Sequence, residues 1–175
     1  LVAAGIPLVL FDRVTEIDQA STVVIDDYLA AFKATEHLIQ QGCRRIAHFA
    51  GQQHLNIYKY RLRGYQEALA AHRIAFDERL VTYTNVKIED GRASMEAMLQ
   101  LEDKPDALFA ASDYAAVGAM QVLKAQGIAI PEEVALVGFA DEPFASLVEP
   151  KLTSVNQMSQ QMGQFAAKIF IEQAQ

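Results

Sequence analysis

The chain has 175 residues, of which 51% are hydrophobic and 21% charged, and its formal net charge is −7. This length leaves room for one ordinary domain or a two-lobed one, and the composition is that of a globular chain that buries a core. The negative charge argues against nucleic-acid binding by this polypeptide alone, because such binding needs a concentrated basic face. The single cysteine, Cys43, excludes an internal disulfide and a multi-cysteine metal site, and no apolar run is long enough to span a bilayer.

Apolar runs and amphipathic stretches alternate along the whole chain. Residues 6–11 and 21–25 read as strands, and residues 28–41 read as a helix that starts near Asp26 and Asp27 and stops at Gly42. The next strands are expected over residues 45–50, 79–83, 107–111 and 134–139, with helices over 60–72, from Glu89 onward and over 114–126 between them. Residues 152–155 read as extended, and residues 158–171 as a final amphipathic helix.

The four strands and three intervening helices between residues 46 and 139 predict an α/β fold with a doubly wound parallel sheet. No Gly-x-Gly-x-x-Gly motif follows the first strand and there is no phosphate-binding loop, so nucleotide use has no support and no cofactor is expected. No serine nucleophile motif and no His-Glu-x-x-His motif is present. His37 and His48 are too far apart in the pattern for a metal pair, so no metal site is expected and the chain does not read as an enzyme.

Polar residues follow directly after several of these strands. Asp12 follows the first, Ser112 comes after the strand at 107–111, and Asp141 and Glu142 come after the strand at 134–139. In open parallel sheets, ligands bind outside the carboxyl ends of the strands. These residues are therefore expected where a polar small molecule would be bound.

Several of the same residues also have plain structural explanations. Asp12 and Arg13 form a surface ion pair about as readily as a ligand contact. Spacing alone favours Arg61 as a solvated surface arginine, although a guanidinium near a helix start and a strand-end loop can grip hydroxyls or a carboxylate with paired donors. Asp113 is best explained as the N-cap of the helix at 114–126, and His48 as a histidine satisfied within the fold.

Short motifs spread over almost the whole chain resemble one known family. They are Ile6-Pro-Leu-Val-Leu-Phe-Asp-Arg13, His37-Leu-Ile-Gln-Gln-Gly-Cys-Arg-Arg-Ile-Ala47, Arg61-Leu-Arg-Gly-Tyr-Gln-Glu-Ala-Leu69, Leu108-Phe-Ala-Ala-Ser-Asp113, Gly127-Ile-Ala-Ile-Pro-Glu-Glu-Val-Ala-Leu-Val-Gly-Phe139 and Pro150-Lys-Leu-Thr-Ser-Val155. In this order they resemble the effector-binding region of the LacI/GalR family of bacterial transcription regulators.

The resemblance implies a truncated two-lobed domain of the type I periplasmic-binding-protein kind, with a small molecule held between the lobes. Residues 1–12 and 152–175 would be pieces of the first lobe, and residues 28–144 most of the second. The DNA-binding helix-turn-helix would lie outside this chain, which is expected to be a fragment. A homodimer that binds operator DNA, a cytoplasmic location and no membrane contact follow from the same resemblance.

The family's effector contacts carry over residue by residue. Arg61 matches the arginine of the family's Arg-Leu-x-Gly motif, Asp12 matches the acid after the first strand, and Gln157 matches a polar residue near the returning segment. Ser112 stands where the family often has asparagine. Ala140 stands where the family often has a ligand-binding acid, which leaves Asp141 as the candidate.

The function implied is the sensing of a sugar or a related small molecule, which shifts the relative orientation of the lobes and thereby DNA binding. The alternatives are a sugar-binding protein of a transport system with the same fold, and an enzyme on a doubly wound sheet. Replacing Arg61 by alanine is expected to abolish effector binding and to leave the fold intact.

Overall fold

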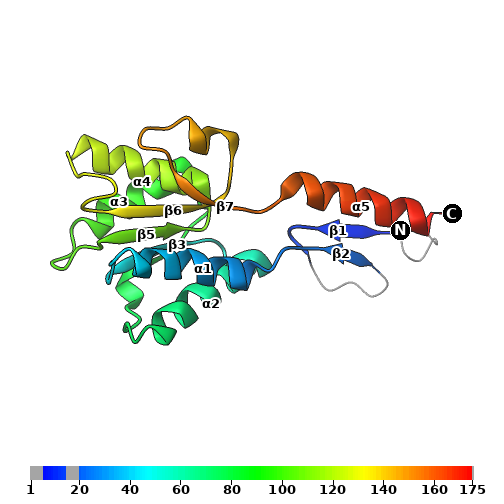
Figure 1. Cartoon of the computed structure of the whole chain (residues 1–175), viewed down its shortest axis with the longest axis horizontal. Helices are drawn as coiled ribbons and strands as arrows, with labels where there is room; N and C mark the ends of the chain where they lie inside the picture. The colour runs from blue at the N-terminus through cyan, green and yellow to red at the C-terminus, as the bar shows by residue number, and fades with distance from the viewer. Residues whose placement is uncertain (1–5, 15–19, 175) are drawn as a thin grey trace.

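A five-stranded parallel sheet forms the centre of the larger part of the molecule. The computed structural model describes residues 6–14 and 20–174, and the strands lie in the order β4-β3-β5-β6-β7. Figure 1 shows this sheet with β3, β5, β6 and β7 labelled. The strands of this sheet are β3 (Ile46–Ala50), β4 (Val81–Tyr83), β5 (Ala107–Ala110), β6 (Ala135–Ala140) and β7 (Thr153–Asn156). Every neighbouring pair is parallel.

Two helices cover each face of this sheet. On one face, α1 (Asp27–Gln40) and α2 (Asn56–Ala71) pack with the side chains of one core cluster. On the other, α3 (Ile88–Met98) and α4 (Asp113–Ala125) pack with a second cluster, which includes Met95 and Met98. The predicted doubly wound α/β sheet, with its four strands and three intervening helices, is therefore confirmed. Central strands covered on both faces explain why β3 and β5 are buried throughout and, apart from His48 in β3, apolar.

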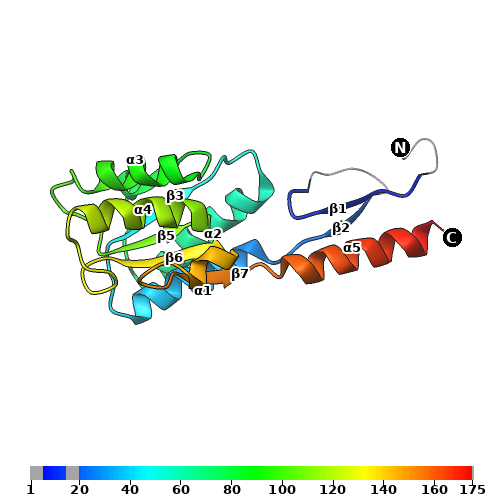
Figure 2. The same cartoon turned by 90° about the horizontal axis from the view of Figure 1, so that it is seen from above.

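A smaller unit lies beyond one end of the large sheet. It consists of the parallel pair β1 (Val9–Phe11) and β2 (Ser21–Val23) with α5 (Ser159–Gln173) alongside, and Figures 1 and 2 show that the molecule is elongated as a result. The side-chain amide of Gln173 donates a 2.7 Å hydrogen bond to Ser21. The start and the end of the described chain therefore lie together, away from the large sheet.

Residues 153–156 belong to the large sheet, although residues 152–175 were expected to be part of the first lobe. Strand β7 pairs with β6 in the large sheet, from Val137 opposite Thr153 to Ala140 opposite Asn156, and Leu152 is buried in the core. The chain leaves this sheet only at Gln157 and Met158, just before α5. The division into two lobes stays a prediction, with the boundary moved from Leu152 to Gln157.

Two helix starts differ in how they are capped. The Asp26 carboxylate accepts a 2.8 Å hydrogen bond from the Leu29 amide, so the predicted cap of α1 is confirmed. The prediction that Asp113 caps α4 is wrong. The cap is Ser112, whose hydroxyl accepts from the Tyr114 amide at 3.2 Å, while Asp113 is the first helical residue and is fully buried.

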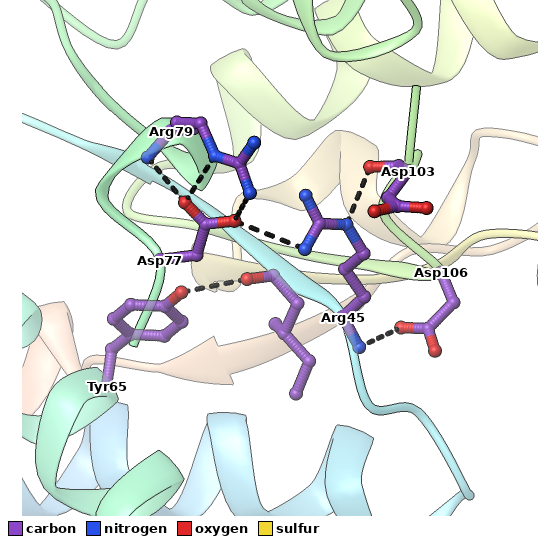
Figure 3. Close-up of polar contacts among 7 residues, drawn as sticks. Arg45, Tyr65, Asp77, Arg79, Asp103 and Asp106 are labelled. Carbon is purple, nitrogen blue, oxygen red and sulfur yellow. Dashed lines mark hydrogen bonds and ion pairs between the residues drawn. The ribbon is translucent and has the colours of Figure 1, made fainter. Parts of the chain in front are cut away.

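Charged residues fix the edge of the sheet at which β3 begins (Figure 3). The Asp106 carboxylate accepts from the Arg45 amide at 2.9 Å, and Arg45 Nε donates to the Asp103 carbonyl at 2.6 Å. Arg45 Nη1 lies 3.2 Å from Asp77, whose pKa lies well below its usual range because Arg79 donates hydrogen bonds to the carboxylate. These contacts hold the segments before β3, β4 and β5 together at this amino-terminal edge.

Within the residues that the structure describes, no helix combines the length and the apolar character needed to cross a membrane.

Candidate functional site

A cavity of about 170 Å³ lies at the carboxyl-terminal edge of the large sheet, next to the end of β1. Four of the five residues predicted to bind the effector line it: Asp12, Arg61, Ser112 and Gln157. They come from the segments after β1, β5 and β7 and from α2, so residues up to 145 positions apart in sequence converge at one edge. The fifth predicted residue, Asp141, does not line it.

Arg61 is the most deeply buried charged group of this cavity. Only 4% of its surface is exposed. Its Nε donates to the Asp27 carboxylate at 2.8 Å, and Nη1 donates to the Ala111 carbonyl at 2.9 Å. A guanidinium carries five N–H donors, so three are left that make no hydrogen bond to any described residue.

Burial dominates the electrostatics of the Arg61–Asp27 ion pair. It raises the pKa of the Asp27 carboxyl and lowers the pKa of the Arg61 guanidinium, and each shift is opposed by the charge of the partner. The guanidinium carbon also lies 3.5 Å from the centre of the Phe139 ring, a cation–π contact that favours the charged form. The interpretation of Arg61 as a solvated surface arginine is therefore wrong, because its partners come from segments that spacing within one helix does not reveal.

The two acids after β6 point to different places. The Asp141 carboxylate accepts a 2.9 Å hydrogen bond from Asn156, while Glu142 lines the cavity. Ala140 and Asp141 both have positive φ, at 125° and 57°, in a region that L residues rarely adopt. This turn places Glu142 and not Asp141 at the cavity, and the effector contact of Asp141 stays a prediction.

Asp12 and Arg13 both line the cavity, from the segment that follows β1. Arg13 Nε lies 4.0 Å from the Asp12 carboxylate, and the two side chains are 58% and 36% exposed. A pair this open to solvent contributes little to stability. The ion pair that was considered as an alternative is therefore present, and it does not occupy all the donors of Arg13.

Two tyrosines of the cavity were not predicted from the sequence. The Tyr58 ring packs over Gly51, where a Cβ atom would lie 2.4 Å from the ring carbons. Tyr114 makes an edge contact with Phe144, with ring centres 4.9 Å apart. The glycine directly after a buried strand was the signal for the first, since glycine permits close approach of another group. No local signal identified the second.

The arrangement offers guanidinium donors, carboxylate acceptors, an amide and a hydroxyl beside aromatic rings, which suits a small molecule rich in hydroxyl groups. The part of the chain that the structure describes contains no group of three or more histidine, cysteine, aspartate or glutamate side chains that could hold a metal ion. His48 lies in the core rather than in the cavity. Its Nδ1 bonds to the Phe109 carbonyl at 2.9 Å, and its Nε2 has no partner among the described residues.

Comparison with known proteins places this geometry in a family. Residues 35–175 match the model of the periplasmic binding protein-like domain. The chain is 40% identical over 171 residues to the HTH-type transcriptional regulator CelR of Thermobifida fusca, and 32% identical over 169 residues to the HTH-type transcriptional repressor CytR of Escherichia coli K12. Each alignment covers 97% of this chain and 50% of the relative, so the chain spans about half the length of the curated relatives that it matches.

Solved structures agree. A CelR–cellobiose complex superposes with a TM-score of 0.89 at 40% identity, covering 97% of this chain and 52% of that one. The transcription regulator CcpA of Lactococcus lactis gives a TM-score of 0.88 at 32% identity, covering 95% of this chain and 60% of that one. The resemblance drawn from the sequence motifs is thereby confirmed, and the chain belongs to the periplasmic binding protein-like domain family, in the form found in LacI-type transcriptional regulators.

Proposed function

We propose that this chain is the effector-sensing part of a LacI-type transcriptional regulator. The observation that carries the proposal is Arg61, a buried guanidinium that is anchored by Asp27 and Ala111 and keeps free donors at a cavity lined by Asp12, Ser112 and Gln157. Such a group binds hydroxyls or a carboxylate with paired hydrogen bonds. The relatives named above are transcriptional regulators, which favours this function over transport or catalysis.

The effector is a sugar or a close derivative. The cavity pairs donors and acceptors with aromatic rings, and the structure of the relative CelR was solved as a cellobiose complex. Glu142 takes the place of the predicted acid Asp141 in this proposal. Asp12 contributes a second acceptor from the smaller unit.

Signalling follows from where the cavity lies. Its walls come both from the large sheet and from the segments that follow β1 and precede α5, so a ligand there would bridge the two units. A ligand that binds one relative orientation better shifts the population toward it by its differential affinity. Operator DNA would be bound by a helix-turn-helix outside this chain, in a cytoplasmic homodimer, and the orientation of the units would set the spacing of the paired DNA-binding segments.

The test is sugar binding by the full-length protein, measured by isothermal titration calorimetry. Arg61→Lys keeps a charge but removes the planar donor fork, and we expect it to weaken binding at least tenfold. Arg63→Ala is the matched control, since Arg63 lies about half a turn away on α2, is exposed, and contacts Glu67 and the Tyr28 ring outside the cavity. Equal sugar affinity in wild type and Arg61→Lys would remove this cavity as the effector site.

A further inference from the structure

A series of hydrogen bonds connects the turn after β6 to the start of α5. The Ser154 hydroxyl accepts from the Asp141 amide at 3.0 Å, and the Asp141 carboxylate accepts from the side-chain amide of Asn156 at 2.9 Å. The side-chain oxygen of Asn156 in turn accepts from the Met158 amide at 2.7 Å. The bonds therefore run from Ser154, within the large sheet, to the residue that precedes α5.

Asn156 stands where the chain leaves the large sheet. It pairs with Ala140 at the end of β7, and α5 begins soon afterwards, at Ser159. Helix α5 lies beside β1 and β2, and Gln173 near its end bonds to Ser21. A change in the orientation of the smaller unit relative to the sheet therefore requires a change in the backbone between Asn156 and Ser159.

Asn156 also holds two strained backbone positions. Asp141 and Met158 have φ of 57° and 54°, in the left-handed region that residues other than glycine rarely adopt. Such conformations persist only where the surrounding contacts maintain them. The side chain of Asn156 bonds to both residues, so it stabilises the turn after β6 and the residue before α5 at the same time.

Residues of the effector cavity are interleaved with this series. Glu142 lines the cavity directly after Asp141, and Gln157 lines it directly after Asn156. A molecule that contacts Glu142 and Gln157 fixes the positions of the two segments that Asn156 joins. Occupancy of the cavity and the bonds of Asn156 therefore restrict the same stretch of backbone.

We propose that Asn156 is a positioning residue that transmits occupancy of the cavity to α5. A ligand that orders Glu142 and Gln157 strengthens the bonds of Asn156 to Asp141 and Met158. It thereby favours one direction of α5 relative to the large sheet. This inference rests on the proposed function and names the regulation of the same site.

The simpler alternative is that Asn156 only closes the turn before α5. A local turn of this kind needs the Met158 amide alone, so substitutions at Ser154 and at Asn156 would act on α5 independently. Independent effects add, whereas effects within one connected series do not. This difference provides a test that needs no ligand.

The test is hydrogen–deuterium exchange of the full-length protein, measured by mass spectrometry of peptides over residues 158–166. Asn156→Ala should speed exchange there about tenfold, and Ser154→Ala about threefold, because each removes hydrogen bonds of the series. The double variant should exchange as Asn156→Ala does, since the series is already interrupted. Thr153→Ala, at an exposed position of β7, is the control and should leave exchange unchanged. Additive effects in the double variant, or no effect of Ser154→Ala at α5, would overturn the inference.

Cellobiose is the probe for the ligand-dependent part, because the structure of the relative CelR was solved with it. Saturating cellobiose should slow exchange over residues 158–166 about tenfold in the wild type, which is an ordinary coupling between two sites. Asn156→Ala leaves the residues of the cavity in place. Its calorimetric affinity for cellobiose should therefore stay within about threefold of the wild type, while the slowing falls below about twofold.

The outcomes separate this inference from the proposed function. Full slowing in Asn156→Ala means that α5 responds without Asn156, and loss of cellobiose binding in this variant means that Asn156 serves the binding site itself. Either result contradicts the inference and leaves the proposed function in place. Absence of cellobiose binding to the wild type counts against the proposed sugar sensing, and the exchange measurements without ligand then decide the inference by themselves.

Discussion

The Ser154 hydroxyl donates a 2.6 Å hydrogen bond to the Asp113 carboxylate, across 41 residues of sequence. The other carboxylate oxygen accepts from the Glu142 amide at 2.8 Å, and Asp113 itself is fully buried. A Cβ atom at position 138 would lie 2.1 Å from this carboxylate, so Gly138 leaves the space that it fills. Asp113 thus ties the loop after β6 to strand β7, beside the cavity.

Replacing Ser154 by alanine removes one of the two partners of a buried carboxylate. We expect the free energy of unfolding to fall by about 1–3 kcal/mol, which is the cost of leaving a buried acceptor partly unsatisfied. The measurement is the urea midpoint of the chain. Thr153→Ala, an exposed position on the same strand, is the control and should change stability by much less. Equal midpoints for both variants would show that the Ser154 bond contributes nothing.

Arg61→Ala should lower the free energy of unfolding as well as abolish effector binding. This corrects the expectation that the substitution leaves the fold intact. Removing one partner of a buried ion pair leaves the other charge uncompensated, and the usual cost is about 3–5 kcal/mol. Asp27 is 5% exposed and would be left in that position. The free energy of unfolding in urea measures the effect.

The double variant Asp27→Leu with Arg61→Met separates the two roles of Arg61. Apolar side chains of similar size often replace a buried ion pair without loss of stability. We expect the double variant to recover most of the stability lost in Arg61→Ala and still not to bind a sugar. Recovery of sugar affinity together with stability would mean that Arg61 acts only through the fold.

Glu142→Gln should weaken effector binding about tenfold, whereas Asp141→Asn should change it by less than about threefold. The reason is that Glu142 lines the cavity while the Asp141 carboxylate is engaged by Asn156, and a hydrogen bond to a charged group is worth about 1.5–3 kcal/mol. Calorimetric affinities of both variants for the same sugar decide this. The reverse order of effects would restore Asp141 as the contact.

Stability should fall as the pH drops from about 6.5 toward 4, because of His48. Burial lowers the pKa of this side chain to about 4 from its usual value of 6.5. Below pH 6.5 the unfolded chain takes up a proton that the folded state does not, so folding loses stability until the folded pKa is reached and the loss levels off. The difference of about 2.5 pKa units corresponds to about 3 kcal/mol.

The control for this pH dependence is His48→Leu, which removes the titrating group from a site between the rings of Tyr65 and Phe109. The difference between the urea midpoints at pH 7 and at pH 4.5 should be smaller in this variant than in the wild type. Similar losses in both proteins would assign the pH dependence to other groups.

The sequence by itself determined the secondary structure and the edge of the sheet at which polar residues gather. Alternating buried strands and amphipathic helices read from residue 46 to residue 139 predicted a parallel sheet, because each pattern reports which local face is buried. The polar residues after the strands then had to lie at the carboxyl-terminal edge, and Asp12 and Ser112 do line one cavity there, together with Gln157, which the family resemblance indicated.

Only the tertiary structure decided how the charged residues of that edge are used. Arg61 is buried against Asp27 and Ala111, which lie 34 and 50 residues away in the sequence. The turn at Ala140, with φ of 125°, places Glu142 rather than Asp141 at the cavity. Local patterns carry the periodicity of one element, whereas these contacts depend on turn geometry and on packing between elements far apart in the chain. The same physical reason explains why Asp113, next to the capping residue, is not the cap but a buried residue that connects the loop after β6 to strand β7.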